Sequence, residues 1–191
     1  MDRLELTDEL RQLETEHAKL REISARLVSF CPQDIENRLC DDCNPRLISE
    51  CAEVVANTLA VLSSVLKSIF EHEERIMNSA CTPPQFSTRF GDHASDHLAL
   101  SRELARLAEV SSGSPPHAMI ADLVNLTRRW AVGHARQYDE PMIAFVAEFS
   151  HSSMQSGQQQ GGASADLLQS AKKLIHDLQT ESWPKGLIDD R

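Results

Sequence analysis

The segment HASDHLALSRELARL, residues 93–107, carries the pattern that decides the fold. Leu100, Leu104 and Leu107 recur at the three- and four-residue intervals that are typical of an amphipathic helix. The same stripe continues backwards through His97 and His93, and side chains four residues apart lie one above the other on a helix face. The segment therefore predicts a helix, over about residues 89–110, that turns two imidazoles as well as leucines towards the protein core.

Three further segments repeat this pattern of an apolar stripe interrupted by ionisable side chains. We expect helices over about residues 6–29, 47–79 and 117–148, with Thr7 as the cap of the first helix. Proline, glycine and polar clusters predict loops over residues 30–45, 81–88 and 111–116. Four long amphipathic helices joined by loops of modest length predict an all-α fold, namely an up-and-down four-helix bundle.

The last quarter of the chain has a different composition. Residues 150–164, SHSSMQSGQQQGGAS, are rich in Ser, Gln and Gly, which predicts a flexible linker. An amphipathic pattern then predicts an additional short helix over about residues 165–180, before the irregular tail WPKGLIDDR. We therefore expect a bundle over residues 1–149, a linker over 150–164, and a short helix with a tail over 165–191.

Charge and composition restrict the partners. A formal net charge of −10 argues against nucleic acid, because an acidic surface repels phosphate. No apolar run reaches the length of about 18 residues that a membrane-spanning helix needs, so no membrane association is expected. The five cysteines are an odd number, and the N-terminal segment MDRLELTDEL does not resemble an export signal. These features predict a reducing, cytoplasmic setting.

The ionisable side chains on the expected inward stripes predict a metal site. A buried charge is costly unless it is paired or bound to metal, and each of the four helices contributes at least one such group. His134 and Asp139 are five residues apart, about 140° around an ideal α-helix, so they share a site only if the helix is distorted, for which Pro141 provides a cause. Imidazole with carboxylate favours iron, manganese or zinc. The predicted metal ligands are His17, Glu73, His93, His97, His134 and Asp139.

Other interpretations of the same residues remain open at this point. In a purely structural bundle, the histidines would form hydrogen bonds in the core and bind nothing. A ferritin-like di-iron site needs Glu-x-x-His on two helices, and only Glu14 with His17 fits that pattern. Cys40 and Cys43 form a single CxxC motif, which is compatible with a redox pair or with simple loop thiols.

The four segments resemble the hemerythrin-like family. That family carries His, HxxxE, HxxxH and HxxxxD on four successive helices. This chain has LETEHAKL around His17, FEHEERIM around Glu73, HASDH at residues 93–97 and HARQYD at residues 134–139, in the same order. The resemblance covers about residues 10–145, and it implies a centre of two non-haem irons.

The resemblance also implies a division of the ligands between the two irons. One iron would bind the imidazoles of His93, His97 and His134. The second iron would bind His17, and the carboxylates of Glu73 and Asp139 would bridge the two irons.

One position departs from the family pattern. HxxxE requires a histidine four residues before Glu73, and Ile69 stands there. The second iron would therefore lack one ligand, so we expect that it is only partly occupied. His72 lies near the same helix face and is the candidate replacement.

Two functions follow as expectations from this resemblance. The first is a protein that binds O₂, or a related small oxidant such as NO or peroxide, for sensing, signalling or storage, with a protein signalling partner. The second is a di-iron enzyme that acts on peroxide, O₂ or NO. A reversible, stoichiometric spectral change would support binding, whereas steady consumption of the small molecule would support catalysis.

Overall fold

Helices account for nearly all of the chain that is described. The computed structural model describes residues 3–30, 43–79, 84–152 and 161–179. Its elements are α1 (Arg3–Phe30), α2 (Pro45–Ser79), α3 (Pro84–Val110), α4 (Pro116–Arg128), η2 (Arg129–Asp139), α5 (Glu140–Ser152) and α6 (Gly161–Gln179). Within the described ranges there is no strand, so the predicted all-α class is confirmed.

Three helices begin earlier than expected, each at a proline. The first residues of α2, α3 and α4 are Pro45, Pro84 and Pro116. Proline suits the first helical turn, because the N–H that it lacks would have no partner there. At the start of α2, Oδ1 of Asn44 also accepts a hydrogen bond from the backbone N–H of Leu47 at 2.9 Å. The loop expected over residues 81–88 is therefore wrong from Pro84 onwards.

Two other helix boundaries differ from expectation. Because α1 already begins at Arg3, Thr7 lies inside this helix, where it is buried, and the predicted cap at Thr7 is wrong. Helical structure also enters the predicted linker from both sides, since α5 continues to Ser152 and α6 begins at Gly161. The middle of that linker, the predicted tail and Cys40 lie outside the described residues.

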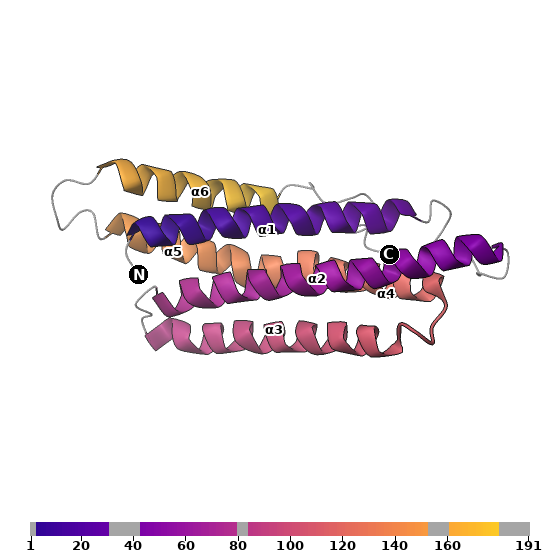
Figure 1. The fold of residues 1–191 in the computed structure, drawn as a ribbon. Helices are drawn as coiled ribbons and strands as arrows, with labels where there is room; N and C mark the ends of the chain where they lie inside the picture. The colour runs from indigo at the N-terminus through magenta and orange to yellow at the C-terminus, as the bar shows by residue number, and fades with distance from the viewer. Residues whose placement is uncertain (1–2, 31–42, 80–83, 153–160, 180–191) are drawn as a thin grey trace.

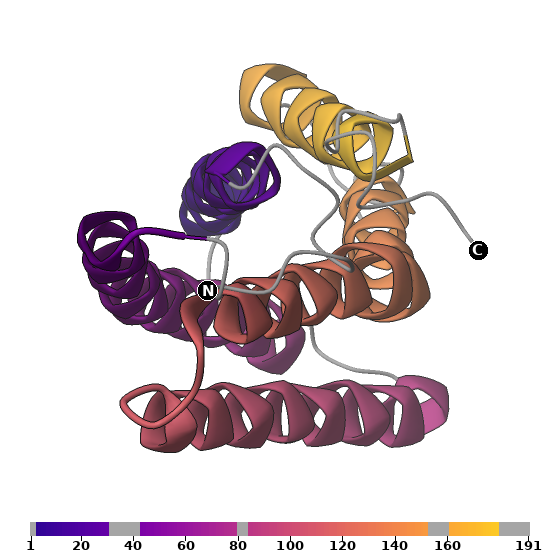
Figure 2. The ribbon, with the colours of Figure 1, turned by 90° about the vertical axis from the view of Figure 1, so that its right-hand side faces the viewer.

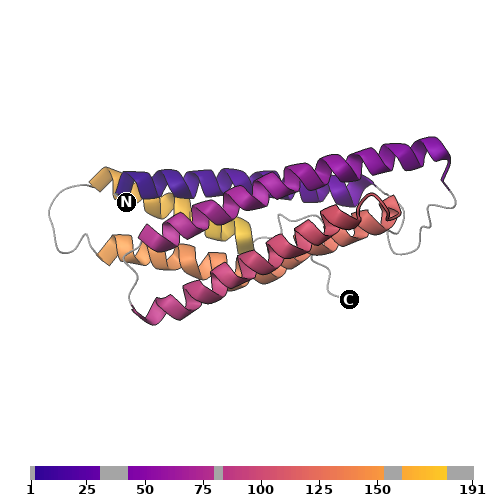
Figure 3. The same cartoon turned by 60° about the horizontal axis from the view of Figure 1, so that its bottom comes forward.

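The long helices lie alongside one another (Figures 1 and 3). α1 packs against α2 and α4, and α3 packs against α2, α4 and η2. α6 packs against α1 and α5, on the opposite side of the molecule from α3 (Figure 2). The four segments that carry the predicted metal ligands therefore face one shared core.

The predicted inward stripes form that core. In α1, the stripe from Leu10 to Leu27 is buried, and in α2 the stripe from Val55 to Ile76 is buried. The helix that runs through α4 and η2 buries Ile120, Leu123, Thr127, Trp130 and His134. The helical spacing of apolar residues thus identified the interior face of each helix correctly, and it did so for the ionisable residues too.

α2 is long and apolar enough, by length and composition alone, to cross a membrane. The helix Pro45–Asn78 contains an 18-residue window with a mean hydropathy of 1.4, of which 39% is buried inside the protein. The sequence does not predict such a span, because Glu53, Asn57 and Lys67 interrupt the apolar residues of this helix. The signal is weak, because core helices of bundles have the same length and composition, and α2 packs against α1, α3 and α4. That the protein does not associate with a membrane therefore remains a prediction from the sequence.

The packing of α6 predicts that this helix contributes to the stability of the whole domain. Leu174 is fully buried in the core cluster, whereas Lys172 on the same helix is exposed. We expect Leu174→Ala to lower the free energy of unfolding by about 2–5 kcal/mol, because a buried leucine leaves a cavity. Lys172→Ala is the matched control and should change it by less than about 0.5 kcal/mol. Equal urea midpoints for both variants would show that α6 does not belong to the cooperative core.

Candidate metal centre

A π-helical stretch places His134 and Asp139 at the same site. η2 spans Arg129–Asp139, and the N–H of Glu140 donates to the carbonyl oxygen of Ala135, five residues back. In such a helix, residues five apart come one above the other. Nε2 of His134 consequently lies 3.0 Å from Oδ1 of Asp139. The predicted distortion is confirmed, and Pro141 explains it, because proline cannot donate to the carbonyl four residues back and its ring clashes with it.

All six predicted ligands are buried. None of the six residues is more than 3% exposed, and three of them are completely buried. Leaving so many ionisable groups in a core without a counter-charge would be strongly destabilising. Their ligand atoms form two groups that share one glutamate, and within each group the atoms lie within 4.8 Å of one another. The first group is Glu73, His93, His97 and His134, and the second is His17, Glu73 and Asp139.

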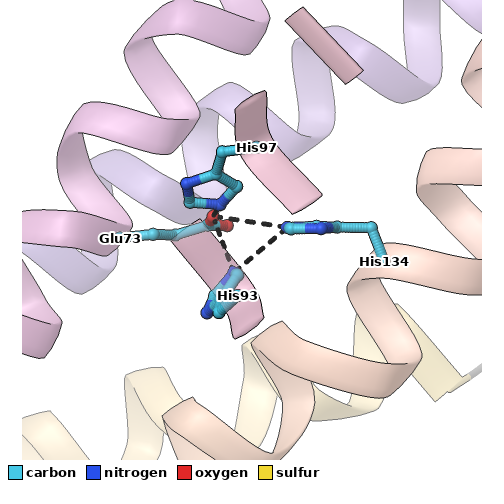
Figure 4. Close-up of side chains that lie close together, drawn as sticks. All are labelled: Glu73, His93, His97 and His134. Carbon is cyan, nitrogen blue, oxygen red and sulfur yellow. Dashed lines mark hydrogen bonds and ion pairs between the residues drawn. The ribbon is translucent and has the colours of Figure 1, made fainter. Parts of the chain in front are cut away.

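The first group brings three imidazoles onto one carboxylate (Figure 4). Nε2 of His97 lies 2.8 Å from Oε2 of Glu73, and Nε2 of His93 lies 3.4 Å from the same oxygen. The Nε2 atoms of His93 and His134 are 3.1 Å apart. The rings come from α3 and η2, and the carboxylate comes from α2, so the convergence depends on the packing of three elements.

Glu73 and Asp139 each direct one carboxylate oxygen towards the three clustered histidines and the other oxygen towards His17. Oε2 of Glu73 faces the three imidazoles, whereas Oε1 lies 3.6 Å from Nε2 of His17. Asp139 repeats this division, with Oδ1 at 3.1 Å from Nε2 of His93 and Oδ2 at 4.0 Å from Nε2 of His17. A carboxylate that bridges two cations divides its oxygens in this way. We call the two parts of the site the three-histidine half and the His17 half.

Two carboxylates outside the centre orient its imidazoles, and the sequence analysis missed both. Nδ1 of His134 donates to Asp96 at 2.8 Å, and Nδ1 of His97 donates to Glu74 at 3.1 Å. Metal-binding histidines commonly donate their second N–H to a carboxylate in this manner. Both acids could have been considered from the sequence, because Asp96 directly precedes His97 and Glu74 directly follows Glu73. With the proton at Nδ1, the lone pair at Nε2 points into the centre.

The inward-facing atoms are therefore mostly acceptors, which is the arrangement that a cation requires. Neither ring nitrogen of His17 has a hydrogen-bond partner among the described residues, and the same holds for Oε1 of Glu73 and both oxygens of Asp139. Lone pairs facing carboxylate oxygens at about 3 Å repel one another unless positive charge lies between them. The residues present thus fit a metal centre with imidazole and carboxylate ligands.

The pKa values show the same demand for positive charge. Burial lowers the pKa of His134, but the adjacent Asp139 and Glu73 outweigh it and raise this pKa from 6.5 to about 11. Burial also lowers the pKa of His93, but the same two carboxylates outweigh this effect and raise the pKa above its ordinary value. Burial raises the pKa of Glu73, but the surrounding imidazoles reverse this and hold it well below its ordinary value. Protons and metal ions therefore compete for one site.

The His17 half has fewer protein ligands. It offers one imidazole with one oxygen from each bridging carboxylate. Ile69, one turn before Glu73, is fully buried and offers no ligand atom. His72 does not replace it, because its Nδ1 lies against Glu9 of α1 and 2.6 Å from Nη2 of Arg75, and it belongs to neither ligand group. The suggested substitution by His72 is thus not supported.

Comparisons with protein-family models, with curated proteins and with solved structures found no match. The arguments for a function therefore depend on the geometry and chemistry of this centre.

Removal of metal by a chelator should leave a protein whose stability depends on pH through His134. A histidine pKa raised from 6.5 to about 11 adds stability that is complete below pH 6.5 and is lost as the pH rises towards 11. We expect the free energy of unfolding of the chelated protein to fall over this range by up to about 1.4 kcal/mol per pH unit. Added metal should reduce this slope, since it replaces the proton.

Urea unfolding at a series of pH values, with and without metal, provides the measurement. The chelated His134→Ala variant serves as the control, and its stability should fall less steeply above pH 6.5. If the wild type and this variant show the same slope, the stability does not depend on the proton at His134.

On the acid side, the lowered pKa of Glu73 adds stability that is lost as the pH falls below its ordinary 4.5.

Proposed function

We propose that this chain is a non-haem iron protein of the hemerythrin-like type, with two irons when fully loaded. It binds O₂ or a related small oxidant, such as NO or peroxide, for sensing, signalling or storage. The observation that carries the proposal is the division of the carboxylate oxygens, because Glu73 and Asp139 each direct one oxygen to the three-histidine half and one to His17. A site for a single cation would not need two carboxylates that each direct their two oxygens to different places.

The ligand types support iron. Imidazole nitrogens suit zinc, copper, iron and nickel, whereas carboxylates alone would suit magnesium, calcium or manganese. A mixed set without thiolate fits an iron centre, and carboxylates that bridge two irons are typical of di-iron bundles. Of the ions that fit, iron supplies reversible chemistry with O₂, whereas zinc undergoes no redox change.

The unequal halves support a small exogenous ligand. Three imidazoles and two carboxylate oxygens nearly complete the coordination of one iron. The second iron would have His17 and two bridging oxygens, so positions remain for a ligand from solution. The oxidant would therefore bind at the His17 half.

The architecture and setting belong to the same proposal. We assign α1, α2, α3 and the continuous helix α4–η2–α5 to an up-and-down four-helix bundle, which their mutual packing supports. We also propose a cytoplasmic location, which the odd number of cysteines supports. A protein partner would read the state of the centre.

A specific observation also favours an enzyme as a second candidate. Ile69 removes a protein ligand from the His17 half, which opens that iron to substrate rather than only to a reversibly bound gas. Peroxide, O₂ and NO are the substrates that such a centre would take. Steady consumption of one of them, instead of a reversible spectral change, would establish this alternative.

The assignment of the three-histidine half is tested by His97→Ala. We expect this variant to lose most of its iron and to melt at a lower temperature in the presence of metal, because metal binding contributes to the stability of the folded state. The control is His176→Ala on α6, whose side chain is exposed. Iron analysis and thermal unfolding of the purified proteins provide the measurement. An iron content and melting temperature equal to those of the wild type would refute the assignment.

The assignment of the His17 half is tested at Ile69. We expect between one and two irons per chain in the wild type, with the second iron lost first to a chelator. Ile69→His should raise the iron content towards two, because it supplies the missing imidazole, whereas Ile69→Val should leave it unchanged. The measurements are iron per chain and the kinetics of chelation. A wild type that holds two equally inert irons would contradict the predicted gap in its coordination.

A further inference from the structure

Aromatic rings surround the imidazoles of the candidate centre. Phe70 stacks on His97 with ring centroids 4.1 Å apart and an angle of 16° between the planes. Trp130 contacts His17 edge to face at 4.9 Å. Tyr138 stacks on His93 at 5.2 Å with an angle of only 11°. An aromatic ring therefore lies directly against each of these three imidazoles.

Tyr138 differs from the other two rings in its position. Phe70 and Trp130 are buried, whereas Tyr138 is partly exposed at the end of η2. It lines a small surface depression together with His93 and Arg89. Tyr138 thus contacts a predicted metal ligand on one side and solvent on the other, and it is the only tyrosine in the chain.

The chemistry of tyrosine fits this position. A phenol loses one electron and one proton to become a neutral radical, and because Tyr138 is partly exposed, the proton can pass to water. Phenylalanine would stack on His93 equally well but is not oxidised under the same conditions. Stacking alone therefore does not require the hydroxyl group.

We propose that Tyr138 is a one-electron relay between the metal centre and the surface, an inference that rests on the proposed iron function. It donates an electron to the centre through the stacked ring of His93, and the resulting radical is reduced at the surface by a small donor such as a thiol or ascorbate. The relay is used when a two-electron oxidant meets a centre that holds only one iron. Partial occupancy of the His17 half makes that state common.

The electrons and atoms balance for hydrogen peroxide as the oxidant. Peroxide needs two electrons and two protons to become two waters. One Fe(II) supplies one electron, and Tyr138 supplies the second electron and one proton, so that Fe(II), the phenol, peroxide and one further proton give Fe(III), the phenoxyl radical and two waters. When both halves hold Fe(II), the two irons supply both electrons, and Tyr138 stays reduced.

The full-length protein loaded with one Fe(II) per chain and treated with limiting peroxide provides the test. We expect a tyrosyl radical by electron paramagnetic resonance, which must be Tyr138 because the chain has no other tyrosine. One Fe(II) should be oxidised per peroxide in the wild type. In Tyr138→Phe, which keeps the stacking, two Fe(II) should be oxidised per peroxide, because the second electron must come from another iron. Iron content should be the same in both proteins.

A relocated tyrosine distinguishes the relay from random attack by radicals in solution. The double variant Tyr138→Phe with Phe145→Tyr moves the single tyrosine seven residues along the helix, about 10 Å from its original place, to another partly exposed position. A spin trap followed by peptide mass spectrometry should label Tyr138 in the wild type and leave the relocated ring unlabelled. Equal labelling at both positions would overturn the relay.

The outcomes also separate the relay from the proposed function. If iron is bound and oxidised by peroxide, but no tyrosyl radical forms and Tyr138→Phe leaves the stoichiometry unchanged, the relay is wrong and the iron function stands. If the protein binds no iron, or bound Fe(II) is inert to peroxide, both are wrong. A radical in the wild type together with the change from one to two irons per peroxide supports both.

Discussion

The attraction of six buried ionisable side chains to shared positive charge is the constraint on which the rest of the structure depends. Burial penalises the charged form of each group, yet Glu73 stays ionised and His134 holds its proton far above the ordinary histidine range. The imidazoles alone do not remove the cost, because His17 has no hydrogen-bond partner among the described residues. A cation would satisfy all the inward acceptors together, and the buried apolar side chains of the core would keep water from competing with it.

The π-helical stretch is how the backbone meets this constraint. An α-helix would turn His134 and Asp139 away from each other, whereas η2 brings them to 3.0 Å. Pro141 contributes by removing the hydrogen bond that would hold the tighter register. The outer acids Asp96 and Glu74 then fix the orientation of two imidazoles, so the centre has a defined geometry before any metal binds.

Asymmetry is the feature that links this geometry to the proposed chemistry. The three-histidine half is rich in ligands and oriented by outer carboxylates, while the His17 half has one imidazole, and the buried Ile69 beside it offers no ligand atom. Firm binding at one half and an open coordination sphere at the other suit a protein that must retain a metal and still admit a small oxidant. Tyr138, stacked on His93 and partly exposed, would connect such a metal with solvent.

The sequence by itself determined the helices, their buried faces and the six clustered residues, because the helical period places apolar and ionisable residues on one stripe whatever the tertiary arrangement. The all-α class followed from the same pattern. Only the tertiary structure decided that Glu73 and Asp139 divide their oxygens, that His72 contacts Glu9 instead of the centre, and that Asp96 supports His134. Those facts depend on distances between helices and on side-chain rotamers, and periodicity along one helix determines neither.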